Sequence, residues 1–187
     1  MKFKIVILAL LLTFSCSSND NNNENSNSCE FDIPFVVQGN KWTSNVTTFG
    51  FDGGQIENEV MACGDNGLEV VITGPTGSIT NIWKQEDGYL WTNANNAVEG
   101  FNRFYKINAE VGDVFTYNNN EGALYTTEVI AVDSTITVPA GTFICDVYKK
   151  TSTNVINETF TMWNHDVGQV KSDSGFTVFE LASYNFD

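Results

Sequence analysis

Positive charge and histidine are scarce in this sequence. Its 187 residues include 9 Lys and Arg against 23 Asp and Glu, a formal net charge of −14, and His165 is the only histidine. Because an acidic surface repels phosphate backbones and anionic headgroups, we expect no nucleic-acid binding. A zinc site usually needs several His or Cys ligands, and a Ser-His-Asp triad needs its base beside a nucleophile. We interpret His165 as a solvated turn residue and expect no metal or other cofactor.

Phosphate-binding loops and long helical patterns are also absent. The sequence has no Gly-rich phosphate loop, and beyond the N-terminal segment no helical period exceeds about two turns. Turn signals instead recur about every 8–12 residues. The 14 Phe, 6 Tyr and 4 Trp suit pleated sheets better than helices. The sequence therefore predicts an all-β domain.

The clearest hairpin signal lies in Val129–Lys150. Apolar residues alternate with polar or small ones on both sides of a central turn, as half-buried strands require. Pro139 fixes φ and lacks an N–H, and Gly141 tolerates a positive φ, so both residues favour the turn. We expect this hairpin to be central to the fold, with Phe143 and Val147 deeply buried.

Other stretches predict further strands and turns. Phe31–Val37 has an apolar period of two and is the expected first strand, although Pro34 indicates a sheet edge or a strand start. Trp42–Phe51 is the expected second strand, followed by a turn at Asp52-Gly53-Gly54. Asp133-Ser134 interrupts an apolar face, so we expect a bulge or a bend there.

The N-terminal segment resembles a bacterial lipoprotein signal. A basic start at Lys2 and Lys4 precedes an apolar run far shorter than the roughly 20 residues that span a bilayer. We expect residues 1–15 to be a signal peptide and Cys16 to carry lipid, including palmitate. Thr13-Phe14 departs from the usual lipobox, so an ordinary secretory signal with an incidental cysteine is the alternative.

The residues after this cysteine fit a tether. Residues 16–28 are polar and of low complexity, so we expect them to be disordered, with one β domain over residues 29–187. A Ser- and Asn-rich run at this place resembles lipoproteins of Bacteroidetes. We therefore expect a lipid anchor in the cell envelope, at the outer membrane, on its periplasmic or its surface-exposed face.

Three further cysteines allow a disulfide. Exported compartments permit disulfides, and spacing alone leaves three possible pairings. Cys145 alternates with Phe143 and Val147 on the expected core face, so we interpret it as a small buried hydrophobe. Cys29 and Cys63 are then the expected pair.

Several short motifs between Ile82 and Tyr184 carry a family resemblance. In order they are IWKQEDGYLW, YKINAEVGDVFTY, TVPAGTFICDVYK, MWNHDVGQVK and FTVFELASY. This order resembles uncharacterised bacterial exported proteins related to the DUF3108 (TapB-like) group. Val138–Phe143, Val167–Lys171 and Glu180-Leu181 match well, whereas Val114-Phe115 stands where a Trp is common. The resemblance implies an antiparallel, strongly curved sheet that forms a clam or partial barrel, and no known activity; a β-sandwich is the alternative.

Acid pairs and tryptophans are the remaining candidates for a site. Glu57/Glu59 and Glu86/Asp87 could flank a glycosidic bond, but they lie in turn-like, polar stretches, so we expect no enzyme. The tryptophans could stack on sugars, although most aromatics in a small β domain fill its core. They are Trp42, Trp83, Trp91 and Trp163.

These observations favour a non-enzymatic envelope lipoprotein whose β domain binds or scaffolds another molecule, with the membrane as a partner through the lipid on Cys16. One alternative is a carrier or sensor that holds an amphiphile in a β-clam. Another is a surface glycan-binding module. Exposed tryptophans in one line would favour the glycan module, and an apolar hollow would favour the carrier.

Overall fold

All regular structure in this protein is β-strand. The computed structural model describes residues 29–93, 100–118, 123–154 and 156–186, and no helix occurs among them. The strands are β1 (Lys41–Thr48), β2 (Phe51–Gly64), β3 (Gly67–Gly74), β4 (Gly77–Glu86), β5 (Tyr89–Asn93), β6 (Asn102–Lys106), β7 (Val114–Asn118), β8 (Leu124–Val138), β9 (Gly141–Ser152), β10 (Thr159–Asn164), β11 (Gly168–Asp173) and β12 (Thr177–Asn185).

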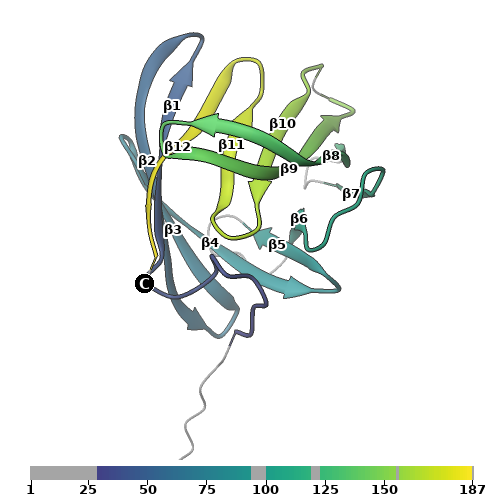
Figure 1. The fold of residues 1–187 in the computed structure, drawn as a ribbon. Coiled ribbons are helices and arrows are strands. Elements are labelled where there is room, and N and C mark those ends of the chain that lie inside the picture. The colour runs from purple at the N-terminus through teal and green to yellow at the C-terminus, as the bar shows by residue number, and fades with distance from the viewer. Residues whose placement is uncertain (1–28, 94–99, 119–122, 155, 187) are drawn as a thin grey trace, which may run out of the picture.

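These strands form one antiparallel sheet that curls into a nearly closed barrel (Figure 1). The order across the sheet is β6-β5-β4-β3-β2-β1-β12-β11-β10-β9-β8-β7. Consecutive strands are therefore neighbours everywhere except at β6 and β7, and the β1–β12 pair joins the two halves of the chain. This architecture confirms the predicted all-β, strongly curved antiparallel sheet.

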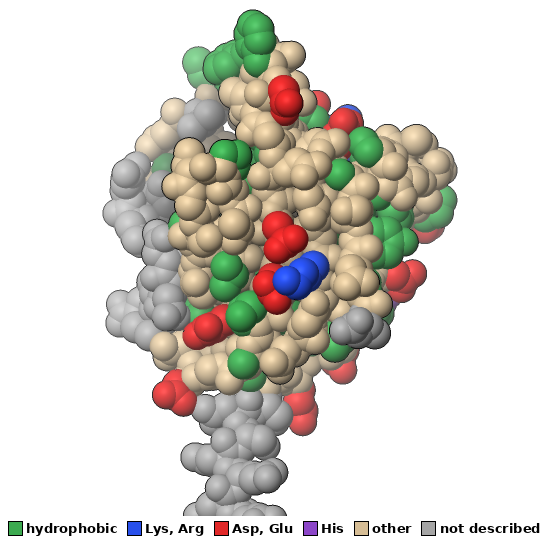
Figure 2. Space-filling view, turned by 90° about the vertical axis from the view of Figure 1, so that its left-hand side faces the viewer, with side chains coloured by type: hydrophobic (Ala, Val, Ile, Leu, Met, Phe, Trp, Pro, Cys, Tyr) green, Lys and Arg blue, Asp and Glu red, His purple; other side chains and the backbone are tan. Residues whose placement is uncertain are grey.

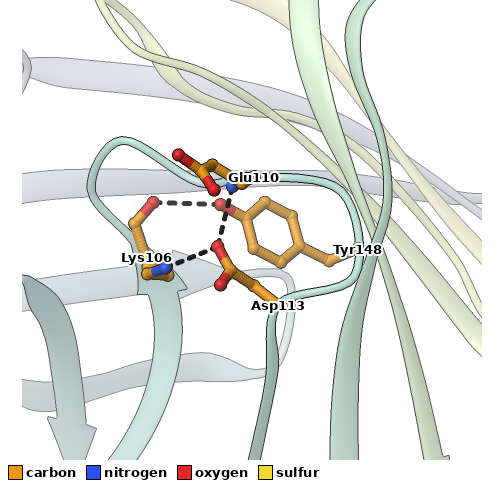
Figure 3. A network of polar contacts seen from close by, with 4 residues as sticks. All are labelled: Lys106, Glu110, Asp113 and Tyr148. Carbon is orange, nitrogen blue, oxygen red and sulfur yellow. Dashed lines mark hydrogen bonds and ion pairs between the residues drawn. The ribbon is translucent and has the colours of Figure 1, made fainter.

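The barrel closes at a seam between the edge strands β6 and β7, which are not neighbours in the hydrogen-bonded order. Side chains and a connecting turn bridge this seam (Figure 3). Lys106 at the end of β6 pairs with Asp113 ahead of β7, and the Asp113 carboxylate also accepts a hydrogen bond from Glu110 N (2.7 Å). The Tyr148 hydroxyl donates to the Lys106 carbonyl (3.1 Å). At this seam polar contacts, and not a ladder of backbone hydrogen bonds between β6 and β7, bridge the two edge strands.

The prediction of a first strand at Phe31–Val37 is wrong. The segment is irregular, and Val36 N donates to Ile33 O (3.0 Å) in a turn that contains Pro34. Phe35 is 0% exposed. Its ring centroid lies 6.0 Å from that of Trp163, 6.3 Å from that of Trp42 and 6.3 Å from that of Tyr105. The period of two does mark buried side chains, but they fill one end of the barrel instead of covering a sheet face.

The predicted turn at Asp52-Gly53-Gly54 is also wrong. These residues belong to β2, and the chain reverses at Phe49-Gly50 instead. Both turn residues have positive φ, 52° and 81°, as a type I′ hairpin turn requires. The Phe49 ring packs on Phe176 at 5.2 Å between centroids, which helps hold an unusual turn residue in place.

The predicted hairpin exists as β8 and β9. Val138 pairs with Gly141 across the turn, and Gly141 has a φ of 139°, which few other residues adopt. The register shifts between Val129 and Ser134, and Asp133 has a φ of 54°, so the expected bulge is confirmed.

The expectation that this hairpin is central is wrong. It lies beside the edge strand β7, whereas β1 and β12 occupy the middle of the order. Val147 is buried as expected, but Phe143 is only partly buried. The bulge bends the strand pair, and its tip crosses to β12, where Ala140 N donates to Leu181 O (3.0 Å).

Candidate ligand-binding site

The inside of the barrel has a packed end and a hollow end. Along each strand, the inward residues change from fully buried to cavity-lining in one consistent direction, for example from Val70 to Ile72 on β3 and from Val129 to Thr127 on β8. The packed end includes Ile33, Phe35, Val60, Val70, Leu90, Tyr105, Val129 and Leu181. The N-terminal segment, drawn in purple at the bottom of Figure 1, covers this end.

The hollow end contains two connected lobes. An apolar lobe of about 300 Å³ is lined by Trp42, Ser44, Ile56, Asn58, Ile72, Asn81, Trp83, Thr92, Phe104, Trp163, Gln169, Ser172 and Phe179. A polar lobe of about 230 Å³ is lined by Thr92, Asn102, Arg103, Phe104, Tyr117, Thr127, Tyr148, Lys150, Thr159, Thr161, Trp163, Gln169 and Ser172. The five shared residues join the lobes into one hollow in the size range of small-molecule sites, about 300–1,000 Å³.

Strand alternation explains how the sequence builds this lining. Many of the lining residues come in pairs two positions apart, such as Asn81 and Trp83 on β4 and Tyr148 and Lys150 on β9. Successive side chains of a strand point to opposite faces, so each pair lies on the same inner face. Strands from both ends of the sheet order contribute, and these meet only inside a curled sheet.

Buried polar atoms without partners gather in this hollow. Among the described residues, the buried side-chain atoms that lack a hydrogen bond are Asn81 Oδ1, Trp83 Nε1, Thr92 Oγ1 and Arg103 Nε. Asn81, Trp83 and Thr92 line the hollow, whereas the Arg103 side chain lies with Trp91 on the opposite face of β5 and β6. Leaving such an atom unpaired costs about 1–3 kcal/mol. The concentration of three of these atoms in one cavity indicates groups that a bound molecule or water would satisfy.

Lys150 places its ammonium at the polar lobe, whereas Arg103 contacts the lobe but turns its guanidinium to the opposite face of β5 and β6, because it pairs with Trp91 next to the inward pair Thr92–Asn102. Burial lowers the pKa of Lys150, because desolvation disfavours its charged form, and its ammonium lies 5.9 Å from the centroid of the Tyr125 ring. Arg103 places its guanidinium 4.8 Å from the Tyr89 ring and 4.6 Å from the Trp91 ring. In the described part of the chain, neither cation forms an ion pair with a carboxylate.

Lysines on the outside of the barrel behave differently. On the face shown in Figure 2, the basic side chains in view lie against acidic ones. Lys41 on β1 forms ion pairs with Glu59 (2.9 Å) and Glu57 (3.9 Å). Lys149, the neighbour of Lys150 in sequence, lies 3.8 Å from both Glu128 and Glu158. On β9, the Lys150 ammonium on the inner face therefore has no ion-pair partner among the described residues, whereas the Lys149 ammonium on the outer face has two.

The cysteines take the places that the sequence favours where the structure describes them. Cys29 and Cys63 form a disulfide with a Cα–Cα distance of 5.8 Å, which ties the irregular N-terminal segment to β2. Cys145 is a buried free thiol, and burial raises its pKa to about 12. Cys16, the predicted lipidation site, lies outside the described residues.

The other predicted candidates lie away from the hollow. His165 is exposed in the turn between β10 and β11, as expected. Glu57 and Glu59 hold Lys41 on the outer face. Glu86 and Asp87 lie exposed at the β4–β5 turn. Among the described residues, no group of three or more His, Cys, Asp or Glu could hold a metal ion.

The tryptophans form no exposed line. Trp42, Trp83 and Trp163 are buried and line the apolar lobe. Trp91 is half-buried, and its indole N–H donates to Glu86 O (3.2 Å).

Sequence reasoning missed the polar residues of the hollow. Strict alternation from Phe143 through Val147 places Lys149, not Lys150, on the inner face. In the structure Tyr148 and Lys150 line the hollow instead, and β9 pairs with β10 in unbroken register from Asp146 to Lys150. The overlooked signal was Asn81-x-Trp83, where a polar residue occupies an inward position of an otherwise apolar strand.

Comparison with known proteins supports the fold. No protein family and no curated protein sequence matches this chain. A crystal structure at 2.22 Å from Bacteroides fragilis, described as that of an exported protein with a YmcC-like fold, matches with a TM-score of 0.53 and 14% identity. The match covers 82% of this chain and 99% of that chain. At this identity the likeness shows a shared fold and nothing more.

No helix within the described residues has the length and apolarity needed to cross a membrane.

Proposed function

We propose that this protein is a non-enzymatic, lipid-anchored binding protein of the cell envelope that holds an amphiphilic small molecule in the hollow of its barrel. The observation that carries the proposal is the concentration of unpaired buried polar atoms in a cavity whose other walls are aromatic and aliphatic. A few convergent polar groups in an apolar cavity are typical of small-molecule sites, because they fix the orientation of a ligand.

The position of the tryptophans favours a carrier or sensor over a surface glycan-binding module. A glycan platform needs aromatic faces in contact with solvent. Here Trp42, Trp83 and Trp163 are 4%, 6% and 4% exposed and face the hollow. A molecule with an apolar part that enters the barrel would contact all three.

Placement in the envelope rests on the N-terminal pattern. A basic start, a short apolar run and Cys16 ahead of a polar tether are typical of lipid-anchored export. The disulfide fits an oxidising compartment. The structural neighbour from Bacteroides fragilis is itself described as an exported protein. The motif order that resembles the DUF3108 (TapB-like) group points the same way.

Binding can be tested on the chain from residue 16 onward, carrying Cys16→Ser and produced in an oxidising compartment. A neutral fluorophore such as N-phenyl-1-naphthylamine should brighten on entering the hollow, because it leaves water for an apolar site. Ile56→Trp, which fills the apolar lobe, should weaken this signal about tenfold or more. Ile130→Trp, on an exposed position of β8, is the matched control and should leave it unchanged. Equal signals in both variants would show that the fluorophore binds elsewhere and would refute the proposal.

The proposed lipid anchor on Cys16 can be tested separately from ligand binding. A clickable palmitate analogue should label the full-length protein in cells, and Cys16→Ser should abolish the label. Cys145→Ser is the control, because this thiol is buried and should not be acylated. Labelling that survives Cys16→Ser would contradict the lipid anchor without affecting the binding proposal.

A further inference from the structure

We propose that the ligand of the hollow is an amphiphile with an anionic head group, which binds beside Lys150 while its apolar chain extends into the apolar lobe. This inference rests on the proposed function and names the chemical class of its ligand.

The distribution of charge carries the argument. The sequence contains 23 Asp and Glu, yet no described residue that lines either lobe is acidic. Lys150, one of the scarce cations, does line the polar lobe. Although acidic residues greatly outnumber basic ones in the chain, the only charge on the described lining of the cavity is thus positive. An unpaired charge away from water is costly, and a bound anion would remove this cost.

The hydrogen-bonding inventory points the same way. Lys and Arg side chains are donors only, and the indole of Trp83 is a donor only. Lys150 has no carboxylate partner among the described residues, and Trp83 Nε1 is a buried, unpaired donor of the apolar lobe, where the acceptor Asn81 Oδ1 is also unpaired. A cavity with spare donors and a cationic group complements a carboxylate or phosphate, whose oxygens accept several charge-assisted hydrogen bonds.

The two lobes also set the orientation. Lys150 lines only the polar lobe, whereas Trp42, Ile72 and Phe179 line only the apolar lobe. Phe104 and Trp163 line both and form the passage between them. A single chain with one anionic end can fill both lobes only with its head beside Lys150.

The test compares three ligands of equal chain length: dodecanoate, dodecyl phosphate and dodecanol. Each displaces N-phenyl-1-naphthylamine from the Cys16→Ser chain described above. We expect at least one of the two anions to bind about tenfold or more tightly than the alcohol, because only an anion gains charge-assisted hydrogen bonds. The tighter of the two identifies the head group as carboxylate or phosphate. Lys150→Gln should erase the preference for the anion and leave the affinity for dodecanol unchanged.

Lys149→Gln is the matched control, because this neighbouring lysine faces outward and pairs with Glu128 and Glu158. It should retain the full anion preference. Retained dodecanol binding also shows that Lys150→Gln is folded. If dodecanol binds as tightly as both anions, or if both lysine variants lose the preference equally, this inference is overturned and the proposed function stands. If the fluorophore and all three compounds fail to bind, both proposals are refuted.

Discussion

Aromatic side chains occur at both ends of the barrel, but they fill a core at the packed end and line a cavity at the hollow end. At the packed end, Phe35 fills the barrel axis and contacts Trp42, Tyr105 and Trp163. At the hollow end none of the described segments enters, and aromatic side chains line a cavity that contains unpaired polar atoms. One continuous sheet thus has a closed core at one end and an open site at the other.

The difference lies in what occupies the axis. A barrel of this many strands is too wide for its own side chains to fill throughout, so a plug or a cavity must take up the remaining space. The irregular segment around Phe35, held by the Cys29–Cys63 disulfide, provides the plug at one end only. Stability should therefore depend mainly on the packed end, and binding mainly on the hollow end.

The largest expected effect is on the plug. Phe35→Ala should lower the free energy of unfolding by about 3–5 kcal/mol, because a fully buried ring leaves a cavity among three other aromatic rings. Urea denaturation measures the loss. Phe51→Ala is the control: this residue is 77% exposed, and its loss should cost no more than about 0.5 kcal/mol. Similar losses in both variants would mean that the packed end is not the main source of stability.

The disulfide should have the next largest effect. Its partners are 34 residues apart, so the double variant Cys29→Ala/Cys63→Ala should lose about 3–4 kcal/mol, chiefly through a less constrained unfolded chain. Mass mapping of the unreduced protein should recover one peptide that joins Cys29 to Cys63. A peptide that joins Cys145 to either cysteine would contradict the pairing.

Sequence patterns predicted local features of the sheet, such as hairpins and bulges, better than they predicted where each segment lies in the fold. Alternation and turn chemistry located the β8–β9 hairpin, its Asp133 bulge and the positive φ of Gly141, because these are local properties. Phe31–Val37 shows the limit of such patterns. Its period of two is the pattern of a strand, yet the segment found its apolar partners at the end of a barrel that the rest of the chain builds.

The candidate site was less accessible to sequence reasoning than the fold. Alternation from Phe143 places Lys149 inward, yet Lys150 lines the hollow, and the hollow itself is built by strands from both ends of the sheet order. The tryptophans were predicted to be mainly core, and three of them are buried. Only the assembled barrel shows that these buried rings also form the wall of a cavity.

At the hollow end, by contrast, we expect a substitution that leaves the free energy of unfolding unchanged or raises it. Lys150→Met should leave stability unchanged or raise it by up to about 1 kcal/mol, because it removes a desolvated cation and keeps an apolar stem. Lys149→Met gives up contacts to Glu128 and Glu158 and should cost a few tenths of a kcal/mol, roughly the value of partly exposed ion pairs. Urea denaturation at neutral pH ranks the two variants. A clear loss of stability in Lys150→Met would mean that this lysine has a structural partner.

The difference in stability between Lys150→Met and the wild type should depend on pH, and the direction of this change can be predicted. Burial lowers the pKa of Lys150 in the folded protein, so the unfolded chain binds its proton more tightly. The resulting penalty is complete below the folded pKa and disappears as the pH rises toward the unfolded value of about 10.4. Any advantage of Lys150→Met over the wild type should therefore shrink between neutral pH and about pH 10. An advantage that grows over this range would contradict the desolvation argument.

A small effect is also expected at the seam, where β6 and β7 lie at the two edges of the sheet and form no ladder with each other. Asp113→Asn removes the ion pair with Lys106 and should cost about 0.5–1 kcal/mol, since both side chains are partly exposed. The hydrogen bond from Lys106, followed by that from Glu110 N, lowers the pKa of Asp113. Its contribution is thus present above the unfolded pKa of about 3.9 and is lost as the pH falls through the lower folded value. Wild type and variant should differ at neutral pH and converge in strong acid.

Hydrogen exchange distinguishes a seam contact from an ordinary surface ion pair. Asp113→Asn should speed exchange at amides of β6 and β7 and leave the β1–β12 ladder at the middle of the sheet unchanged. Asp87→Asn, in the exposed β4–β5 turn, is the control and should change neither stability nor exchange at the seam. If Asp113→Asn speeds exchange evenly over all strands, the ion pair stabilises the barrel as a whole. The two edge strands would then be held together by the packing behind them, such as the Tyr89 and Phe115 rings 5.3 Å apart, and not by the polar contacts that bridge the seam.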